Sequence, residues 1–418
     1  MSQQGPILVV SAARRPSFAL ALDETKLFPV IETGWADAAV AVEQVQPAAV
    51  LAAMSDVSEA EFAALARRIA ARQPYLPLIA VDPKIQLPDN AIPFFQSQDR
   101  QSQGLQSQGN ANRLIARLRA ALRVRSLHAT VMRRLAPSPP IALSEVDTNR
   151  DATLLLVGRG GAYPALSVSL GERTGVVGAL SIEAAAKHLN TRDIDGIVLG
   201  GGFSPRVVDA FLTVLTEDAR FRHLPVVVTA VDLAPTYELA NLEIVSDDIE
   251  QVVATALPLI RQHAFETHLS RTLKSIDAEG LIDVRTGLLT SAAFERDFAS
   301  AVYQTQERGG GLSVARFAFD PAHPRAQFDG ARIISRLMRR MDFGAIGEDG
   351  SAVVAFAETD LKTAHAIARR LSSVMRHTSH GKRDTRAEPA VTVATLLPSD
   401  SAKSLLARLH DEARRAAS

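Results

Sequence analysis

The chain has 418 residues, which is too long for one ordinary hydrophobic core and predicts two or three domains. Lys plus Arg and Asp plus Glu number 46 each, so no overall charge favours nucleic acid or an anionic membrane as a partner. The absence of cysteine excludes disulfides, thiolate metal sites and cysteine catalysis. No signal-peptide pattern begins the chain, and no apolar run approaches the roughly 18 residues that span a bilayer. We therefore expect a globular cytoplasmic protein without membrane insertion.

Residues 1–135 alternate short apolar runs with helical patterns, which predicts an α/β domain with a parallel sheet flanked by helices. The expected elements are strand 6–10, helix 36–44, strand 48–53, helix 58–71 with a serine cap, strand 76–81 and helix 112–134. The polar low-complexity segment 96–110 predicts a loop. The stretch 136–150 is rich in proline and polar residues and predicts an interdomain linker.

Residues 151–265 repeat this alternation, which indicates an internal repeat and a second domain of the same class. The expected elements are strand 153–157, strand 174–178, helix 181–189, strand 196–199, helix 205–216, strand 224–230 and helix 247–263. The last helix runs on through 265–276, so that residues 266–280 form a helical connector, either a dimer stalk or an ordinary amphipathic link. Gly200–Gly202 lacks the Lys-Ser/Thr pair of a P-loop, so we expect a tight turn there.

The most informative motif lies near residue 340, where Arg339 and Asp342 form an R-x-x-D that is followed by five residues and then by a small polar turn. The turn consists of Glu348, Asp349, Gly350, Ser351 and Ala352. This layout resembles the signature of GGDEF domains, a family that makes or senses the second messenger cyclic di-GMP. In that family an R-x-x-D inhibitory site lies five residues before a G-G-[DE]-E-F hairpin turn. The resemblance implies an intact binding motif and a degenerate catalytic motif, whereas R-x-x-D alone would also suit a solvated helix end.

Flanking segments resemble the same family over residues 281–418, which implies an α+β GGDEF domain there. Asp283–Phe294 is similar to the family's opening D-x-L-T-G-L-x-N-R-x-x-F. Residues 357–361, with the helix 362–375, are similar to its P-x-T-D-L turn and the helix after it. Two later elements match only in part, the strand 391–395 and the helix 402–416.

The resemblance also implies which residues catalysis would need, and most of them are absent. Active members carry metal-binding aspartates on the strand similar to residues 312–319 and a carboxylate at the third hairpin position, whereas this chain keeps Asp320 and has Gly350. Glu348 and Asp349 replace the two glycines that admit the nucleotide, and we expect their carboxylates to be solvated. Phosphodiester formation from GTP needs metal ions. We therefore expect no enzyme activity, no catalytic residue, no metal and no cofactor.

Both N-terminal domains resemble the receiver domains of response regulators, which implies a flavodoxin-like, doubly wound fold for each. The phospho-accepting aspartate of that family is replaced by Ala53 in the first domain and by Gly200 in the second. The acidic pairs that hold Mg²⁺ are replaced by Ser11-Ala12 and Gly158-Arg159, and only Thr229 matches. We expect two pseudo-receivers without phosphorylation, in the layout of receiver–receiver–GGDEF regulators.

These residues predict a non-catalytic cyclic di-GMP receptor and adaptor in bacterial second-messenger signalling. Arg339 would donate to guanine O6 and N7 and to phosphate, and Asp342 would accept from guanine N1 and N2, because the two share one helix face. Arg370 lies where the family places a second basic contact. We expect cyclic di-GMP as a regulatory ligand, a homodimer, unidentified protein partners and no nucleic acid. The alternatives are a nucleotide-independent interaction scaffold and a weakly active diguanylate cyclase.

Overall fold

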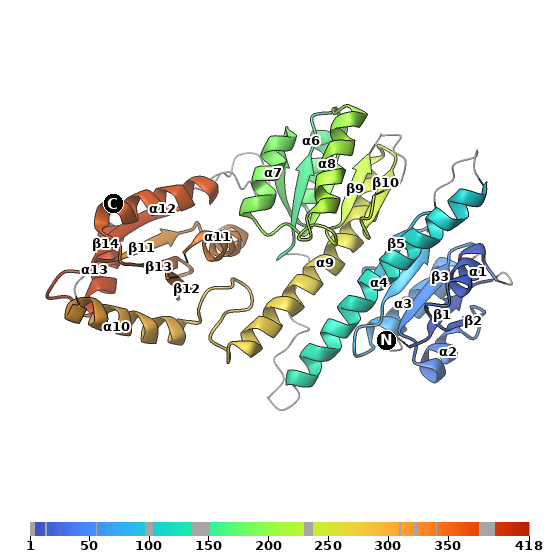
Figure 1. Cartoon of the computed structure of the whole chain (residues 1–418), viewed down its shortest axis with the longest axis horizontal. Coiled ribbons are helices and arrows are strands. Elements are labelled where there is room, and N and C mark those ends of the chain that lie inside the picture. Colours follow the sequence, from blue (N-terminus) through green and yellow to red (C-terminus); the bar gives the residue numbers. More distant parts are fainter. Residues whose placement is uncertain are drawn as a thin grey trace. The chain divides into compact units, whose positions relative to one another are not determined.

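The computed structural model describes residues 5–12, 15–55, 57–96, 103–135, 151–229, 237–308, 311–321, 324–339, 341–375 and 389–417. Three sheets organise the protein, two with five strands and one with four (Figure 1). The chain divides into two compact units. One contains residues 1–152, 156–169 and 195–269, and the other contains residues 153–155, 170–194 and 270–418. Among the described residues, no helix combines the length and the hydropathy needed to cross a bilayer.

The first sheet has the strand order β2-β1-β3-β4-β5, and every neighbouring pair is parallel. Its strands are β1 (Ile7–Val10), β2 (Val30–Thr33), β3 (Ala49–Ala53), β4 (Leu78–Val81) and β5 (Ala91–Phe94). This is the strand order of flavodoxin-like doubly wound folds. Strands β1, β3 and β4 are buried on both faces, which explains why they read as continuous apolar runs. The expected parallel α/β sheet is therefore confirmed.

Four helices accompany this sheet, namely α1 (Ser17–Glu24), α2 (Ala38–Val45), α3 (Glu59–Ala70) and α4 (Gln103–Leu135). The predicted serine cap of α3 is confirmed, because Ser58 Oγ accepts from the Glu61 amide and the Glu61 carboxylate accepts from the Ser58 amide.

Two predictions for this domain are wrong. Helix α1 and strand β2 lie where only a loop was expected, and residues 103–110 belong to α4. Glutamine is a good helix former, so a polar segment extends an existing helix at low cost; residues 97–102 lie outside the described part.

The second sheet has the order β10-β9-β8-β6-β7, which is the order of the first sheet counted from its other edge. Its strands are β6 (Thr153–Val157), β7 (Gly175–Ala179), β8 (Gly196–Leu199), β9 (Val226–Thr229) and β10 (Leu242–Val245). The helices that follow β6, β7 and β8 are α6 (Tyr163–Gly171), α7 (Ile182–Thr191) and α8 (Pro205–Glu217). The shared order confirms the internal repeat. The linker predicted at 136–150 lies outside the described residues.

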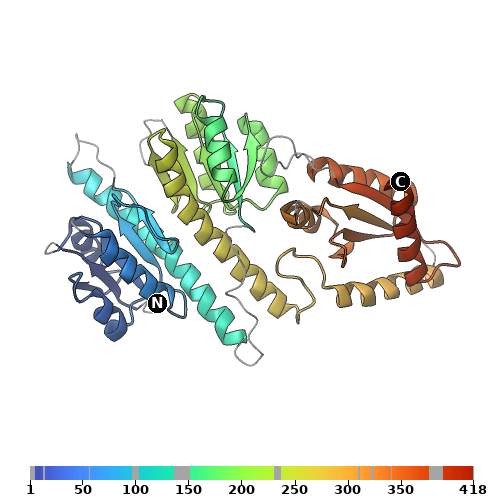
Figure 2. The same ribbon diagram turned by 180° about the vertical axis from the view of Figure 1, so that it is seen from behind.

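Helix α9 (Ile249–Asp277) is continuous through the predicted extension, as both ribbon views show (Figures 1 and 2). In the first unit it packs against α4. Arg123 donates two hydrogen bonds to Glu266, at 2.7 and 3.0 Å, and the Phe265 ring meets Tyr75 and His128 edge to face. This part of α9 is therefore covered within the chain. The dimer stalk stays a prediction.

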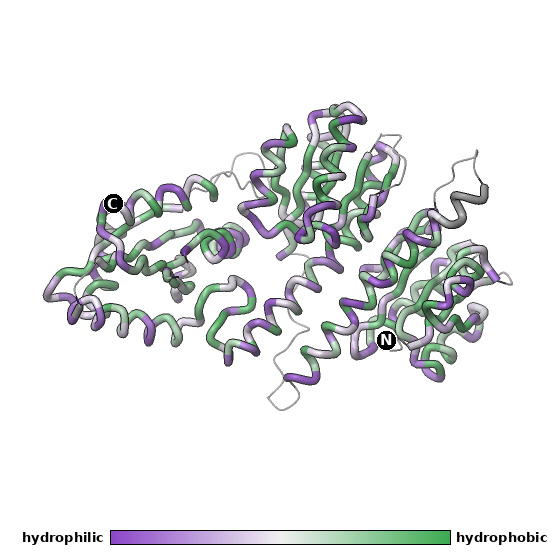
Figure 3. The backbone as a smooth tube through the Cα atoms, viewed as in Figure 1, coloured by the Kyte–Doolittle hydropathy of each residue, from purple (hydrophilic) through white to green (hydrophobic). Residues whose placement is uncertain are grey.

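The third sheet is antiparallel, with the order β12-β13-β11-β14. Its strands are β11 (Leu312–Ala318), β12 (Phe343–Ile346), β13 (Ala352–Ala357) and β14 (Ala390–Thr395), and its helices are α10 (Ser291–Arg308), α11 (Pro324–Leu337), α12 (Leu361–Met375) and α13 (Ala402–Ala417). Alternate residues of β11 enter two cores. Phe317 packs with α11 and α12 on one face, and Val314 packs with α10 and α13 on the other. The strands are accordingly apolar, whereas the helices have polar outer sides (Figure 3).

Candidate functional site

The R-x-x-D motif lies in a turn that follows α11, because that helix ends at Leu337. The Asp342 amide donates to the Arg339 carbonyl at 3.1 Å, and the Arg339 amide donates to Asp342 Oδ2 at 3.3 Å. The prediction that the two residues share one helix face is therefore wrong. Phe343 begins β12, so the chain must leave the helix before it, and the aspartate carboxylate satisfies an amide that the helix no longer serves.

The two side chains of the motif differ in exposure. Arg339 is exposed, whereas Asp342 is only 4% exposed. Asp342 Oδ1 is buried and has no hydrogen-bond partner in the part of the chain that the structure describes. Burial raises the pKa of Asp342, and the amide and positive charge of Arg339 only partly oppose this. The guanidinium is thus available to a ligand as it stands, but the carboxylate must turn outward before it can accept a hydrogen bond from one.

Arg370 is exposed on α12. Helices α11 and α12 pack together in one core, where Ile334 lies among the same buried residues as Ile367 and Leu371. The candidate basic residues Arg339 and Arg370 therefore come from the end of one helix and the surface of its packed neighbour.

The hairpin turn that contains residues 348–351 joins β12 to β13. The Gly347 amide donates to the Ser351 carbonyl at 2.8 Å, and the Gly350 amide donates to the Gly347 carbonyl at 3.0 Å. Gly350 has φ of 77°, which favours glycine, and a Cβ there would lie 2.9 Å from the Gln327 side chain. Glu348 is exposed, and Ala352 is the first, buried residue of β13. The segment therefore keeps the hairpin shape while its side chains differ from those of the family signature.

Asp349 is held inside this turn by specific partners. Its Oδ1 accepts from the amide and the hydroxyl of Ser351 at 3.0 and 2.6 Å, and its Oδ2 pairs with Arg316 of β11 at 2.6 Å. Burial would raise its pKa, but the bonds from Ser351 and Arg316 lower the pKa to about 2. The expectation that this acid is merely solvated is wrong. Sequence reasoning missed the role of Arg316, although a basic residue in the middle of an apolar strand was a visible signal.

Carboxylates that could hold a metal ion are not gathered around this turn. Among the residues that the structure describes, no group of three or more His, Asp or Glu side chains has a suitable arrangement. Asp320 lies beyond the end of β11, and both oxygens of Asp349 already have partners. The absence of a metal site stays a prediction.

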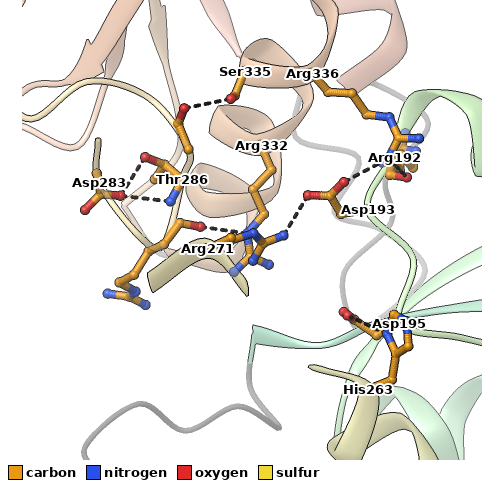
Figure 4. Close-up of polar contacts among 12 residues, drawn as sticks. Arg192, Asp193, Asp195, His263, Arg271, Asp283, Thr286, Arg332, Ser335 and Arg336 are labelled. Carbon is orange, nitrogen blue, oxygen red and sulfur yellow. Dashed lines mark hydrogen bonds and ion pairs between the residues drawn. The ribbon is translucent and has the colours of Figure 1, made fainter. Parts of the chain in front are cut away.

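The opening motif at Asp283 is a structural turn that docks onto α11 (Figure 4). Asp283 Oδ1 accepts from the amide and the hydroxyl of Thr286 at 2.8 and 2.6 Å. Ser335 donates to the Gly287 carbonyl at 2.9 Å, and Arg332 donates to the Arg285 carbonyl at 2.8 Å. These bonds fix the helix whose end leads into the R-x-x-D turn.

At the carboxyl ends of the first sheet's strands, the described residues include no group of three or more acids or histidines that could hold a metal ion. Ala53 ends β3, and Ser11 follows β1. Asp82 follows β4, and the amide and side chain of Gln96 donate to its two oxygens at 2.8 and 2.7 Å. That acid therefore stabilises the loop after β5.

At the carboxyl ends of β6 and β8 in the second sheet, glycines allow the two loops to pack closely against each other. A Cβ on Gly158 would lie 3.4 Å from Gly200 Cα, and the amides of Arg159 and Gly160 both donate to the Gly201 carbonyl, at 3.1 and 3.0 Å. Residues 201–203 form a bend in which Gly202 has φ of 103°, so the chain changes direction where a tight turn was expected. Thr229 at the end of β9 is fully buried.

A separate hollow of about 230 Å³ lies in the first unit between α3 and the loop after β4. It is lined by Glu59, Phe62, Ala63, Ile85, Gln86, Leu87 and Pro88. Its one charged group is a carboxylate, which would repel a phosphate ligand. The R-x-x-D turn remains the better candidate for an anionic ligand.

No protein-family model matches the chain, and no curated protein matches it. Among solved structures, the coiled coil and GGDEF domain of DgcB from Caulobacter crescentus, in complex with c-di-GMP, is 18% identical, with a TM-score of 0.28, over 35% of this chain and 87% of that one. The GGDEF domain of FimX from Pseudomonas aeruginosa is 19% identical, with a TM-score of 0.28, over 31% and 90%. Diguanylate cyclase SiaD with its activator SiaC, also from Pseudomonas aeruginosa, is 14% identical, with a TM-score of 0.30, over 35% and 64%. Likenesses this weak carry no functional argument.

Proposed function

We propose that this protein is a non-catalytic receptor and adaptor for cyclic di-GMP. In this proposal residues 281–418 form a degenerate GGDEF domain, and residues 1–135 and 151–265 form two pseudo-receivers. The observation that supports it most strongly is the contrast between the residues at the base and at the tip of the β12–β13 hairpin. The exposed Arg339 at its base is available to a ligand, whereas Asp349 at its tip is tied to Arg316.

Ligand binding is supported by the chemistry of the R-x-x-D turn. Cyclic di-GMP carries two phosphates and two guanine edges, and an exposed guanidinium can donate to either. Arg339 supplies that group, and Arg370 supplies a second one from the neighbouring helix. Asp342 would accept from guanine N1 and N2 once its carboxylate turns outward. The ligand then supplies hydrogen-bond donors to an oxygen that has none among the described residues.

Loss of catalysis is supported by the Arg316–Asp349 pair. GGDEF enzymes draw their metal-binding carboxylates from the strand similar to β11 and from the hairpin turn. Here those two elements carry a guanidinium and a carboxylate that neutralise each other at 2.6 Å. The Asp349 carboxylate is thereby occupied by a guanidinium and is not open to Mg²⁺, and without metal ions the triphosphate charge is not neutralised. A residual diguanylate cyclase would contradict this, and incubation of the purified protein with GTP and Mg²⁺ tests it; we expect no cyclic di-GMP.

The second candidate function is an interaction scaffold that binds no nucleotide. The inward position of Asp342 favours it, because a carboxylate that is 4% exposed contributes nothing to a ligand without rearrangement. Homodimerisation and unidentified protein partners are proposed for either function. Light scattering of the purified protein with and without ligand tests the homodimer.

Isothermal titration of cyclic di-GMP into the full-length protein separates the two functions. We expect binding by the wild-type chain at micromolar concentration or below. Arg339→Ala and Arg370→Ala should each weaken it about tenfold or more, because each removes a charge-assisted hydrogen bond. Arg369→Ala is the matched control, since Arg369 is also exposed on α12 and should leave the affinity unchanged. Wild-type protein that binds nothing would favour the scaffold, and equal affinities of wild type and Arg339→Ala would refute the site.

A further inference from the structure

Residues at and just beyond the end of helix α7 contact residues of α9, α11 and α12, and Figure 4 shows the contacts of Asp193 with Arg271 and Arg336. Asp193, two residues beyond α7, accepts from Arg336 of α11 at 2.8 Å and from Arg271 of α9 at 2.6 Å. The set of Leu189, Arg192, Asp193, Arg271 and Arg336 is called the clip below. A carboxylate shared by two guanidinium groups on separate helices fixes the positions of all three elements.

Two arginines of the clip each donate hydrogen bonds to the end of a helix other than their own. Arg336 donates to the carbonyls of Leu189 and Arg192 at 3.3 and 2.8 Å, where α7 ends. Arg192 in turn donates to the Val374 carbonyl at 2.7 Å, in the last turn of α12. The final carbonyls of a helix lack partners within the helix, and its C-terminus favours positive charge. Each arginine therefore stabilises the end of a helix on the other side of the contact.

The residues of the clip differ in exposure. Arg192 is 4% exposed, and burial lowers its pKa to about 10. Burial alone would raise the pKa of Asp193, but the charges of Arg271 and Arg336 outweigh this and lower the pKa below its ordinary value. The cavity inside the contact is about 10 Å³, room for about one water. The side chains of Asp193 and Arg336 are 34% and 30% exposed, so removal of one charge costs the hydrogen bonds of this pair and leaves the other group accessible to water.

The clip lies at the ends of the two helices that carry the candidate ligand arginines. Arg336 precedes Arg339 by three residues, and Val374 follows Arg370 by four. We propose that the clip sets the cyclic di-GMP affinity of the R-x-x-D site by holding the ends of α11 and α12 in fixed positions. This inference rests on the proposed function. Its residues are positioning residues that touch no ligand, and they lower the cost of ordering Arg339 and Arg370 on binding.

Linkage gives the inference a second consequence. If an intact clip tightens ligand binding, the ligand must stabilise the clip by the same factor. Arg271 belongs to α9, so ligand binding at the R-x-x-D site would stabilise the contact that this helix makes with Asp193. Ligand should therefore slow amide hydrogen exchange in residues 189–193 and 270–277.

The test compares Asp193→Asn, Arg336→Gln and their double variant with the wild-type chain by titration of cyclic di-GMP. We expect each single change to raise Kd about 5- to 20-fold. The double change should raise it by less than the product of the two single effects, because both single changes remove the Asp193–Arg336 pair. Asp195→Asn is the matched control. Asp195 is an acid two residues further along the chain, but it contacts His263, and both residues belong to the first unit, so the Kd of Asp195→Asn should equal that of the wild type.

Structural damage and positioning are separated by two further measurements. Arg336→Lys keeps a donor and a charge and should recover part of the affinity lost in Arg336→Gln. Circular dichroism confirms that each variant is folded. Binding by the wild type with unchanged Kd in Asp193→Asn and Arg336→Gln would overturn the inference alone. No binding by the wild type would overturn the proposed function and this coupling with it.

Discussion

Asp342 places a carboxylate where its environment favours the neutral form. It is 4% exposed, one oxygen lacks a partner among the described residues, and burial raises its pKa above the ordinary value. An aspartate whose pKa is higher in the folded than in the unfolded chain adds stability at low pH and loses it as pH rises through the folded pKa. At neutral pH the ligand-free turn therefore carries a free-energy cost that a hydrogen-bonding ligand can offset.

We expect Asp342→Asn to raise Tm at pH 7 by a few degrees, since the amide removes the buried charge and keeps an acceptor for the Arg339 amide. The advantage should shrink as pH falls toward 4, where Asp342 of the wild type is increasingly protonated. Thermal unfolding at pH 7 and pH 4 measures both effects. A lower Tm for the variant at pH 7 would contradict the inward carboxylate.

The ion pair of Arg316 and Asp349 predicts the opposite pH dependence. The pKa of Asp349 is lowered to about 2, so its contribution to stability is present above the unfolded value and is lost as pH falls through the folded value. We expect Arg316→Ala to destabilise the protein at pH 7 by about 0.5–1 kcal/mol, since Asp349 is partly exposed and solvent screens the pair. Urea unfolding at pH 7 and pH 2.5 checks this.

The control for that measurement is Arg296→Ala. Arg296 pairs with its neighbour Asp297, and both side chains are largely exposed. Its loss should change stability little at either pH. A cost of Arg316→Ala that persists undiminished at pH 2.5 would show that the arginine acts by packing and not through Asp349.

Among the elements, the β12–β13 hairpin is held in shape by its backbone. Its turn is closed by backbone bonds of Gly347 and by the positive φ of Gly350, neither of which depends on the side chain of Glu348. The strands on either side are fixed by pairing, as Phe343 opposite Ala355 and Ile346 opposite Ala352. A hairpin of this kind holds the R-x-x-D turn at its base whatever residues stand at its tip.

A matched pair of glycine substitutions tests this element. Gly350 and Gly280 have almost the same φ, 77° and 76°, but a Cβ on Gly350 would lie 2.9 Å from Gln327 while one on Gly280 meets nothing within 4 Å. We expect Gly280→Ala to cost about 1 kcal/mol from backbone strain and Gly350→Ala to cost about 1 kcal/mol more. Urea unfolding measures the difference. Equal costs would mean that Gln327 moves aside freely.

At the scale of the whole molecule, a buried ion pair joins parts of the first unit that are far apart in sequence. Arg117 of α4 and Glu243 of β10 are 2.8 Å apart, and each side chain is 1% exposed. Arg117 also donates to the carbonyls of Pro93 and Ala240, and Arg113 pairs with Glu243 at 3.2 Å. The carboxylate thus links the first sheet's long helix to the edge of the second sheet.

Removal of one partner from this pair should be strongly destabilising. We expect Glu243→Ala to cost about 3–5 kcal/mol, because it leaves a buried guanidinium without a countercharge. The double change Arg117→Met with Glu243→Leu should recover most of that loss, since no fully buried charge is then left, and Arg113, which is 21% exposed, keeps contact with solvent. Chemical unfolding of the three variants measures this. A double variant as unstable as Glu243→Ala would contradict the explanation.

The sequence by itself determined most helices and strands, the internal repeat and the candidate site near residue 340. These signals are local, because helix and strand periods and the R-x-x-D register appear within short windows. Only the tertiary structure decided that the Asp342 side chain is buried. It also decided that Arg316 pairs with Asp349, 33 residues later in the sequence, and that Arg336 pairs with Asp193, 143 residues earlier. Such contacts depend on sheet register and helix docking. The sequence pattern does not encode these ion pairs, because a different strand register or helix position would leave the same charged side chains unpaired.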